Sequence, residues 1–98
     1  MAKRSGEQQT KHDRKAAQIA RQFERDGWSV QADLPGYAQP DPVGVNRHVP
    51  DVVATKAGAT RIIEVETPET MEADTEQHEA FRRSAAQRRR TSFKVEEA

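Results

Sequence analysis

Apolar residues recur along the chain with two different periods, which predict alternating helices and strands. Between residues 9 and 26 the apolar side chains fall three and four positions apart, the spacing of an amphipathic helix. This stripe consists of Ala16, Ile19, Ala20 and Phe23. Gly27 ends the predicted helix. From Trp28 to Leu34 apolar and polar residues then alternate, which predicts a half-buried strand.

Two β-branched runs in the middle of the chain predict a hairpin. They cover about residues 51–56 and 61–67, and the five residues 56–60 that join them include a glycine. Pro68 ends the second strand. The segment 35–50, which holds four prolines and two glycines, predicts a long loop before the hairpin.

A second helix and a closing strand complete the predicted fold. Thr70 or Asp74 caps a helix that reaches about Arg90, and residues 91–95 alternate again as a strand. Phe81 and Ala85 are the inward anchors of this helix. The order helix, three strands, helix, strand predicts one α+β domain over residues 9–98, after a flexible N-terminus of residues 1–8.

Composition excludes several classes of protein. The chain has no cysteine, so disulfides and thiolate metal sites are excluded. No apolar run approaches the roughly 20 residues of a membrane helix, and no apolar signal core follows the N-terminus. We therefore expect a cytoplasmic protein with no membrane partner.

The net charge of zero hides three blocks of opposite sign. Residues 1–30 carry seven Lys and Arg against four Asp and Glu, and residues 31–80 carry three against ten. Residues 81–98 carry six against two. An acidic centre between basic flanks suits a phosphate polymer held through a metal ion, but the charge blocks alone favour ordinary helices with solvated faces.

Three carboxylates fall on the predicted hairpin. Glu64 and Glu66 are two positions apart on one strand, so their side chains point to the same face. Asp51 opens the partner strand. Like charges on one face repel and raise one another's pKa unless a positive group lies between them. A divalent metal ion is the simplest such group, and the alternative is a polar strand face in water.

The element order and these acidic residues resemble the PD-(D/E)XK nuclease superfamily, whose restriction-endonuclease-like fold includes archaeal Holliday junction resolvases. The resemblance extends from the first helix to the closing strand, and it implies a mixed sheet flanked by two helices. Asp51, after Pro50, matches the metal-binding Asp of the family, and Glu64 matches the acidic first position of the (D/E)XK element. Glu66 stands where the family usually has Lys, although some type II restriction enzymes also place Glu there.

The resemblance implies a nuclease-like domain that binds DNA and hydrolyses phosphodiesters with Mg²⁺ or Mn²⁺. Asp51, Glu64 and Glu66 would be catalytic, and Asp51, Glu64 and the carbonyl of Val65 would hold the metal. Glu66 cannot supply the charge of Lys, but it can accept a proton or hold a second metal ion. The alternative is an inactive relative that binds nucleic acid or a protein. Resolvases of this type also make a homodimer an option.

Basic and polar residues around the hairpin are the predicted contacts to nucleic acid. Arg47 and His48 end the long loop, and Gln77 lies one turn before Phe81. Five arginines follow at positions 82, 83, 88, 89 and 90, and Arg82 and Arg89 are spaced to share one helix face along a phosphate backbone. The alternative is pairing of the arginines with Glu76, Glu79 and water. His12 and His78 have no second ligand at a useful spacing and are predicted to lie on the surface.

Overall fold

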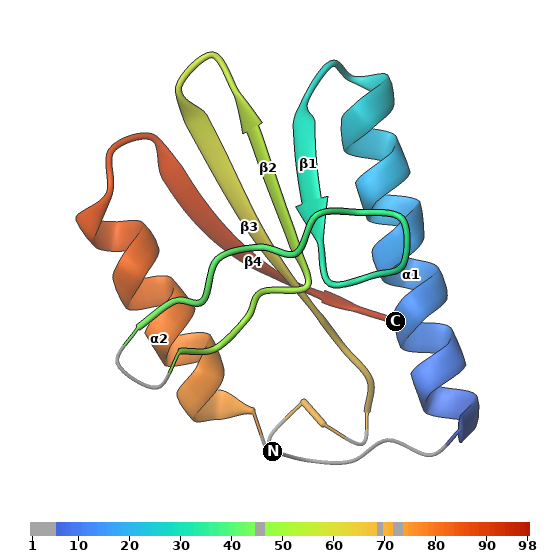
Figure 1. Cartoon of the computed structure of the whole chain (residues 1–98). Helices are drawn as coiled ribbons and strands as arrows, with labels where there is room; N and C mark the ends of the chain where they lie inside the picture. Colours follow the sequence, from blue (N-terminus) through green and yellow to red (C-terminus); the bar gives the residue numbers. More distant parts are fainter. Residues whose placement is uncertain (1–5, 45–46, 69, 72–73) are drawn as a thin grey trace.

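Two helices and four strands follow one another in the predicted order (Figure 1). The computed structural model describes residues 6–44, 47–68, 70–71 and 74–98. Helix α1 spans Gly6–Arg25 and helix α2 spans Thr75–Gln87. The strands are β1 (Ser29–Ala32), β2 (Val52–Lys56), β3 (Ala59–Glu66) and β4 (Thr91–Glu97). The predicted α+β class is confirmed.

The four strands form one open, mixed sheet in the order β1-β2-β3-β4. Strands β1, β2 and β3 pair antiparallel, with Val52 opposite Ile63. Strand β4 pairs parallel with β3, with Phe93 opposite Ile62. A parallel pair needs a long crossover connection, and α2 lies in that connection.

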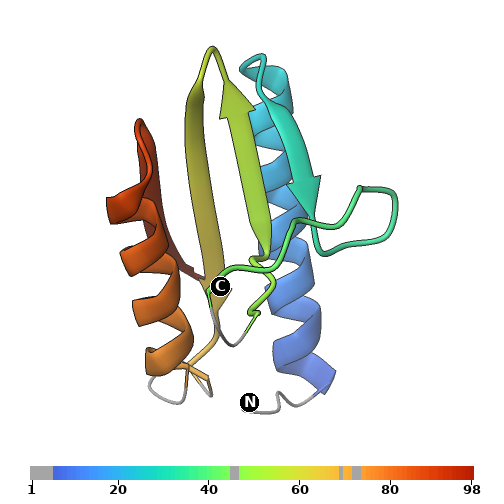
Figure 2. The same cartoon turned by 60° about the vertical axis from the view of Figure 1, so that its left-hand side comes forward.

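The two helices cover opposite faces of the sheet (Figure 2). Because side chains alternate along a strand, Ile63 and Val65 face α1, where Ala16 and Ala20 complete the main core. Residues 62, 64 and 66 point to the other face. There Phe81 of α2 packs against Phe93, with ring centroids 5.7 Å apart. The carboxylates of β3 are therefore covered by α2 and not left in water.

The β2–β3 turn is shorter than the predicted five-residue loop. Only Ala57 and Gly58 lie between the strands, with φ of 50° and 84°. Positive φ at both positions is the requirement of a two-residue turn whose twist matches that of the strands. Arg90 closes the turn by donating to the Ala57 carbonyl at 2.7 Å.

Three element boundaries also differ from the prediction. Helix α1 begins at Gly6, inside the segment predicted to be flexible. Strand β1 ends at Ala32, because the Ala32 N–H bonds the carbonyl of Ala38 at 3.0 Å in the following loop. Helix α2 ends at Gln87 and not near Arg90, because the chain turns back into β4 through extended backbone at residue 88 and a φ of 51° at Arg90.

Candidate functional site

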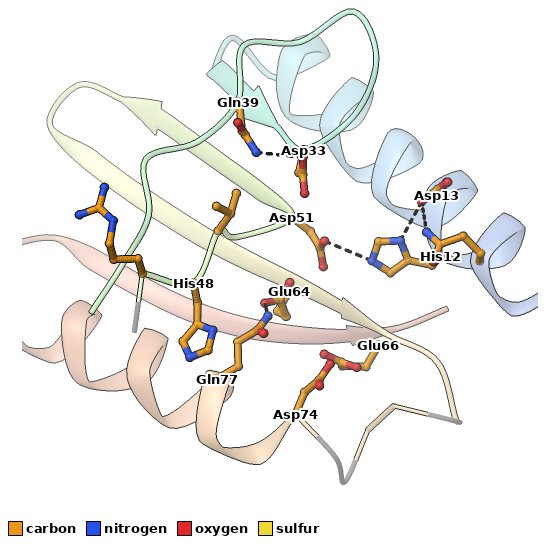
Figure 3. Close-up of a pocket in the computed structure, with 13 residues that line it drawn as sticks. His12, Asp13, Asp33, Gln39, His48, Asp51, Glu64, Glu66, Asp74 and Gln77 are labelled. Carbon is orange, nitrogen blue, oxygen red and sulfur yellow. Dashed lines mark hydrogen bonds and ion pairs between the residues drawn. The ribbon is translucent and has the colours of Figure 1, made fainter. Parts of the chain in front are cut away.

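A cavity of about 550 Å³ lies between α1, α2 and the adjoining ends of β2 and β3 (Figure 3). Six carboxyl side chains line it: Asp13, Asp33, Asp51, Glu64, Glu66 and Asp74. Its basic side chains are Arg47, His12 and His48. Carboxyl groups therefore outnumber basic groups on its wall, and such a cavity favours cations.

Asp51 and Glu64 meet at the centre of this cavity. Asp51 stands opposite Glu64, one step beyond the Val52–Ile63 pair of the β2–β3 ladder. The two carboxyl groups lie close enough for each to shift the pKa of the other. The N–H of Val65 also donates to Asp51 Oδ2 at 2.8 Å. Two of the three predicted catalytic residues thus lie opposite one another in the cavity.

The pKa values of Asp51 and Glu64 are shifted in opposite directions. Burial, together with the hydrogen bond and charge of Asp51, raises the pKa of Glu64 to about 11. Burial also opposes ionisation of Asp51, but hydrogen bonds from His12, Glu64 and the Val65 N–H outweigh it and lower the pKa of Asp51. Glu64 therefore keeps its proton beside an ionised Asp51. A cation that binds both carboxylates has to displace that proton.

His12 is a buried partner of Asp51, and its prediction as a surface residue is wrong. The residue is 6% exposed, and its Nε2 lies 3.2 Å from Asp51 Oδ1. Its Nδ1 lies 2.9 Å from Asp13 Oδ1. His12 continues the helical stripe of Ala16 and Ala20, at intervals of four residues. A polar residue on an apolar stripe needs a partner once it is buried, and this was the signal for its role.

Gln77 reaches Glu64 from the first turn of α2. Its Nε2 donates to Glu64 Oε2 at 2.5 Å. Gln77 was predicted to contact nucleic acid; it lines the cavity and also orients one carboxyl of the pair. The hydrogen bond lowers the pKa of Glu64, but less than burial and Asp51 raise it.

Glu66 points to the same face but into a separate network at the base of α2. The residue is 1% exposed, and its Oε1 lies 2.9 Å from His78 Nε2. Its other oxygen accepts the hydroxyl of Thr70. Burial raises the pKa of Glu66, and the hydrogen bonds from Thr70 and His78 offset part of that rise. The network ties β3 to α2, and the catalytic role predicted for Glu66 stays a prediction.

His78 is also buried, contrary to the prediction of a surface residue. It is 8% exposed and lies on the inward stripe of α2 with Phe81 and Ala85. Its spacing of three and seven residues from these anchors carried the same signal as the stripe of α1.

Arg47 and His48 both line the cavity, at the end of the long loop. The ring of His48 packs edge-on against Phe81, with centroids 6.2 Å apart. Its Nε2 is buried and has no hydrogen-bond partner in the described part of the chain. Both residues share the cavity wall with Asp51 and Glu64.

Arg82 and Arg89 do not line the cavity. Arg82 lies over the ring of Phe93, 5.5 Å from its centroid, and pairs with Glu79 Oε1 at 3.1 Å. Arg89 follows the end of α2, so it does not share a helix face with Arg82. The seven-residue spacing of Arg82 and Arg89 therefore does not bring them onto one helix face.

The donor set fits a hard, hydrated cation. Across residues 6–44, 47–68, 70–71 and 74–98, no three His, Asp or Glu side chains are grouped to enclose an ion. Mg²⁺ needs fewer protein ligands, because it keeps several waters and is bound by one or two carboxylates plus substrate phosphate. Asp51 and Glu64 supply those carboxylates. The N–H and C=O of a strand residue face the same edge, so we expect the Val65 carbonyl on the Asp51 side.

Comparison with known proteins assigns no family to the chain. No protein-family model matches it, and no curated protein matches it either. None of the helices in the described residues is long and apolar enough to cross a membrane. The function has to be argued from the geometry of the site.

Proposed function

We propose that this chain is a PD-(D/E)XK-like nuclease domain that binds Mg²⁺ and a DNA phosphodiester at the Asp51–Glu64 pair. One observation carries the proposal: half-buried Asp51 and buried Glu64 lie opposite one another on neighbouring strands, in a cavity lined mainly by carboxyl groups. The restriction-endonuclease-like fold belongs to the same proposal. The element order, the mixed sheet and the helices on opposite faces support it.

The residues around the pair fix its geometry. The Val65 N–H and His12 hold Asp51, and Gln77 holds Glu64, so both carboxylates are oriented before a ligand arrives. When bound, Mg²⁺ would neutralise phosphoryl charge and lower the pKa of a bound water. Preorganised ligands of this kind cost no reorganisation during the reaction.

Arg47 and His48 take the place of the lysine that the family usually has. Among the described residues of the cavity wall, Arg47 is the one side chain that stays positively charged at any ordinary pH. His48 Nε2 is buried and has no hydrogen-bond partner in the described residues, so a phosphate oxygen or a water that reached it would supply the missing partner. For Glu66 we propose an anchoring role through His78 in place of proton transfer.

The second candidate function is an inactive relative that binds nucleic acid without cutting it. Glu66 supplies no positive charge beside the pair, and its carboxylate is engaged by Thr70 and His78. A binding module needs the cavity and its cations but no activated water.

Cleavage of labelled single-stranded, duplex and branched DNA with Mg²⁺ or Mn²⁺ tests the proposal. Asp51→Asn and Glu64→Gln should each abolish cleavage, because each removes one anionic ligand. Asp41→Asn, an exposed carboxylate outside the cavity, is the matched control and should retain activity. Cleavage that survives Asp51→Asn contradicts the assignment. Binding without any cleavage supports the inactive relative.

A further inference from the structure

A second groove, of about 500 Å³, lies between α1 and the loop that follows β1. Arg14, Ala17 and Arg21 form its helical wall, and their spacing of three, four and seven residues places them on one stripe. Leu34, Pro35 and Tyr37 form its other wall. We name this groove the α1 groove.

The α1 groove combines two uncommitted positive charges with an apolar floor. Arg14 and Arg21 are exposed, and neither makes an ion pair or a side-chain hydrogen bond with a described residue. Their positions are about 10 Å apart along the helix axis, from the rise of 1.5 Å per residue. Ala17, Leu34 and Tyr37 are half-buried and supply the floor.

Tyr37 is held in place within this groove. Its hydroxyl donates to Glu24 Oε1 at 2.6 Å, which ties the loop to α1 and engages the carboxylate of Glu24. An aromatic ring that is already fixed loses little conformational entropy when a flat ligand stacks on it.

The α1 groove adjoins the cavity of the Asp51–Glu64 pair. Asp13 lines both hollows, next to His12. The loop of residues 33–39 lies between the two hollows, and its side chains line both of them. Asp33 and Gln39, whose side chains are 3.4 Å apart, line the cavity. Figure 1 shows this loop beside α1, between β1 and the long connection to β2.

We propose that the α1 groove binds a single-stranded segment of DNA that continues from the phosphodiester held at the Asp51–Glu64 pair. This inference rests on the proposed function. Arg14 and Arg21 contact backbone phosphates, and a base stacks on Tyr37 over Leu34. Guanidinium groups beside an aromatic platform are the means by which proteins hold single strands without reading sequence. Duplex bases are stacked inside the helix and cannot reach this floor.

The charge contribution is tested by binding of a short oligothymidylate in EDTA, over a series of salt concentrations. The double variant Arg14→Gln with Arg21→Gln should flatten the log–log salt slope by about 1.4, from about 0.7 per single-strand phosphate. Lys11→Gln with Arg25→Gln removes the same charge from exposed positions of α1 outside the groove, and should change the slope less. Equal changes in the two double variants would overturn the inference.

The stacking contribution is tested by two substitutions of Tyr37. Tyr37→Leu should weaken oligothymidylate binding by roughly 5- to 100-fold, the usual loss for one stacked base. Tyr37→Phe keeps the ring but loses the hydrogen bond to Glu24, and should keep most of the affinity. Equal losses in both variants would overturn the inference, because the ring would then not be the binding element. Affinity for a blunt duplex should respond to neither change.

The outcome separates the groove from the nuclease proposal because binding in EDTA needs no metal. Asp51→Asn should abolish cleavage and retain oligothymidylate binding in EDTA. If the groove variants lose oligothymidylate binding and the native protein cuts no DNA, the result would support the proposed DNA-binding groove and contradict the proposed nuclease activity. If the native protein cuts single strands and the groove variants bind like the control variants, the result would support the nuclease activity and overturn the proposed DNA-binding groove.

Discussion

Replacing Glu64 by Gln tests whether the pair shares a proton. Glu64 is 2% exposed and lies between Asp51 and Gln77. Gln has nearly the same shape, and its amide can donate to Asp51 at any pH. The substitution therefore keeps the packing and the hydrogen bond to Asp51, and removes the ionisable group.

The expected magnitude follows from the direction of the pKa shift. Glu64 in the unfolded chain loses its proton near about pH 4.3. In the native protein its pKa is raised to about 11, so the native state binds one proton more above that pH. The stability from this proton is fully present below about pH 4 and is lost as pH rises, by about 1.4 kcal/mol per unit. Between about pH 5 and 7 the loss is about 3 kcal/mol. Asp51, whose pKa is lowered, is ionised in both states over this range and contributes no slope.

Urea denaturation at several pH values in EDTA measures this effect. The free energy of unfolding of Glu64→Gln minus that of the native protein should grow by about 1.4 kcal/mol per pH unit between about pH 5 and 7. Glu79→Gln removes an exposed carboxylate of α2, and its curve should run parallel to that of the native protein. A difference between Glu64→Gln and the native protein that stays constant over this range would refute the shared proton.

Three further predictions concern the metal, the turn and the network of Glu66. Mg²⁺ affinity should rise about tenfold per pH unit, because one proton leaves the Asp51–Glu64 pair when the ion binds. Calorimetry in buffers of different ionisation enthalpy measures that proton, and an affinity that does not change with pH would contradict its release. Ala57→Gly, at a φ of 50°, should raise the free energy of unfolding by about 0.5–1 kcal/mol. Ala86→Gly on the exposed side of α2 should lower it by as much. A lower free energy of unfolding for Ala57→Gly in urea denaturation would contradict the assigned turn. His78→Ala removes one hydrogen-bond partner of buried Glu66 and should cost about 1–3 kcal/mol in the same measurement. Arg83→Ala on the exposed side should stay within about 0.5 kcal/mol, and equal costs would contradict the anchoring role.

The order of elements could be predicted because it depends on local periodicity. The apolar stripe of α1, the β-branched run of β3 and the alternation of β4 are each visible in neighbouring residues. The placement of Asp51 on the strand that pairs with the strand of Glu64 could be predicted too. The register that sets Asp51 opposite Glu64 could not, because it depends on the two-residue turn. The parallel pairing of β4 with β3 could be predicted only from the family resemblance, because it joins segments that are distant in sequence.

The partners of the carboxylates could not be predicted in the same way. His12 is almost forty residues from Asp51 in sequence, and their contact depends on how α1 crosses the sheet. The signal present in the sequence was local: His12 and His78 each occupy the apolar stripe of a helix. That signal indicates burial, and burial requires a partner, but it does not say which one.

The end of α2 and the length of the β2–β3 turn could not be predicted from the residue types in these segments. A run of arginines favours a helix, yet α2 ends at Gln87, because the chain has to reverse before β4 can pair with β3. Likewise Ala57 adopts a positive φ that its own propensity disfavours, since the strands on both sides fix the turn.

A Mn²⁺ titration of isotope-labelled protein, followed by paramagnetic broadening of its amide signals, tests the Asp51–Glu64 site most directly. The account predicts that Val52 and Val65 broaden first, that Mg²⁺ reverses the broadening, and that Glu64→Gln removes it. Broadening that begins at Glu24 and Asp26, at the far end of α1, and is unchanged by Glu64→Gln would contradict the central claim.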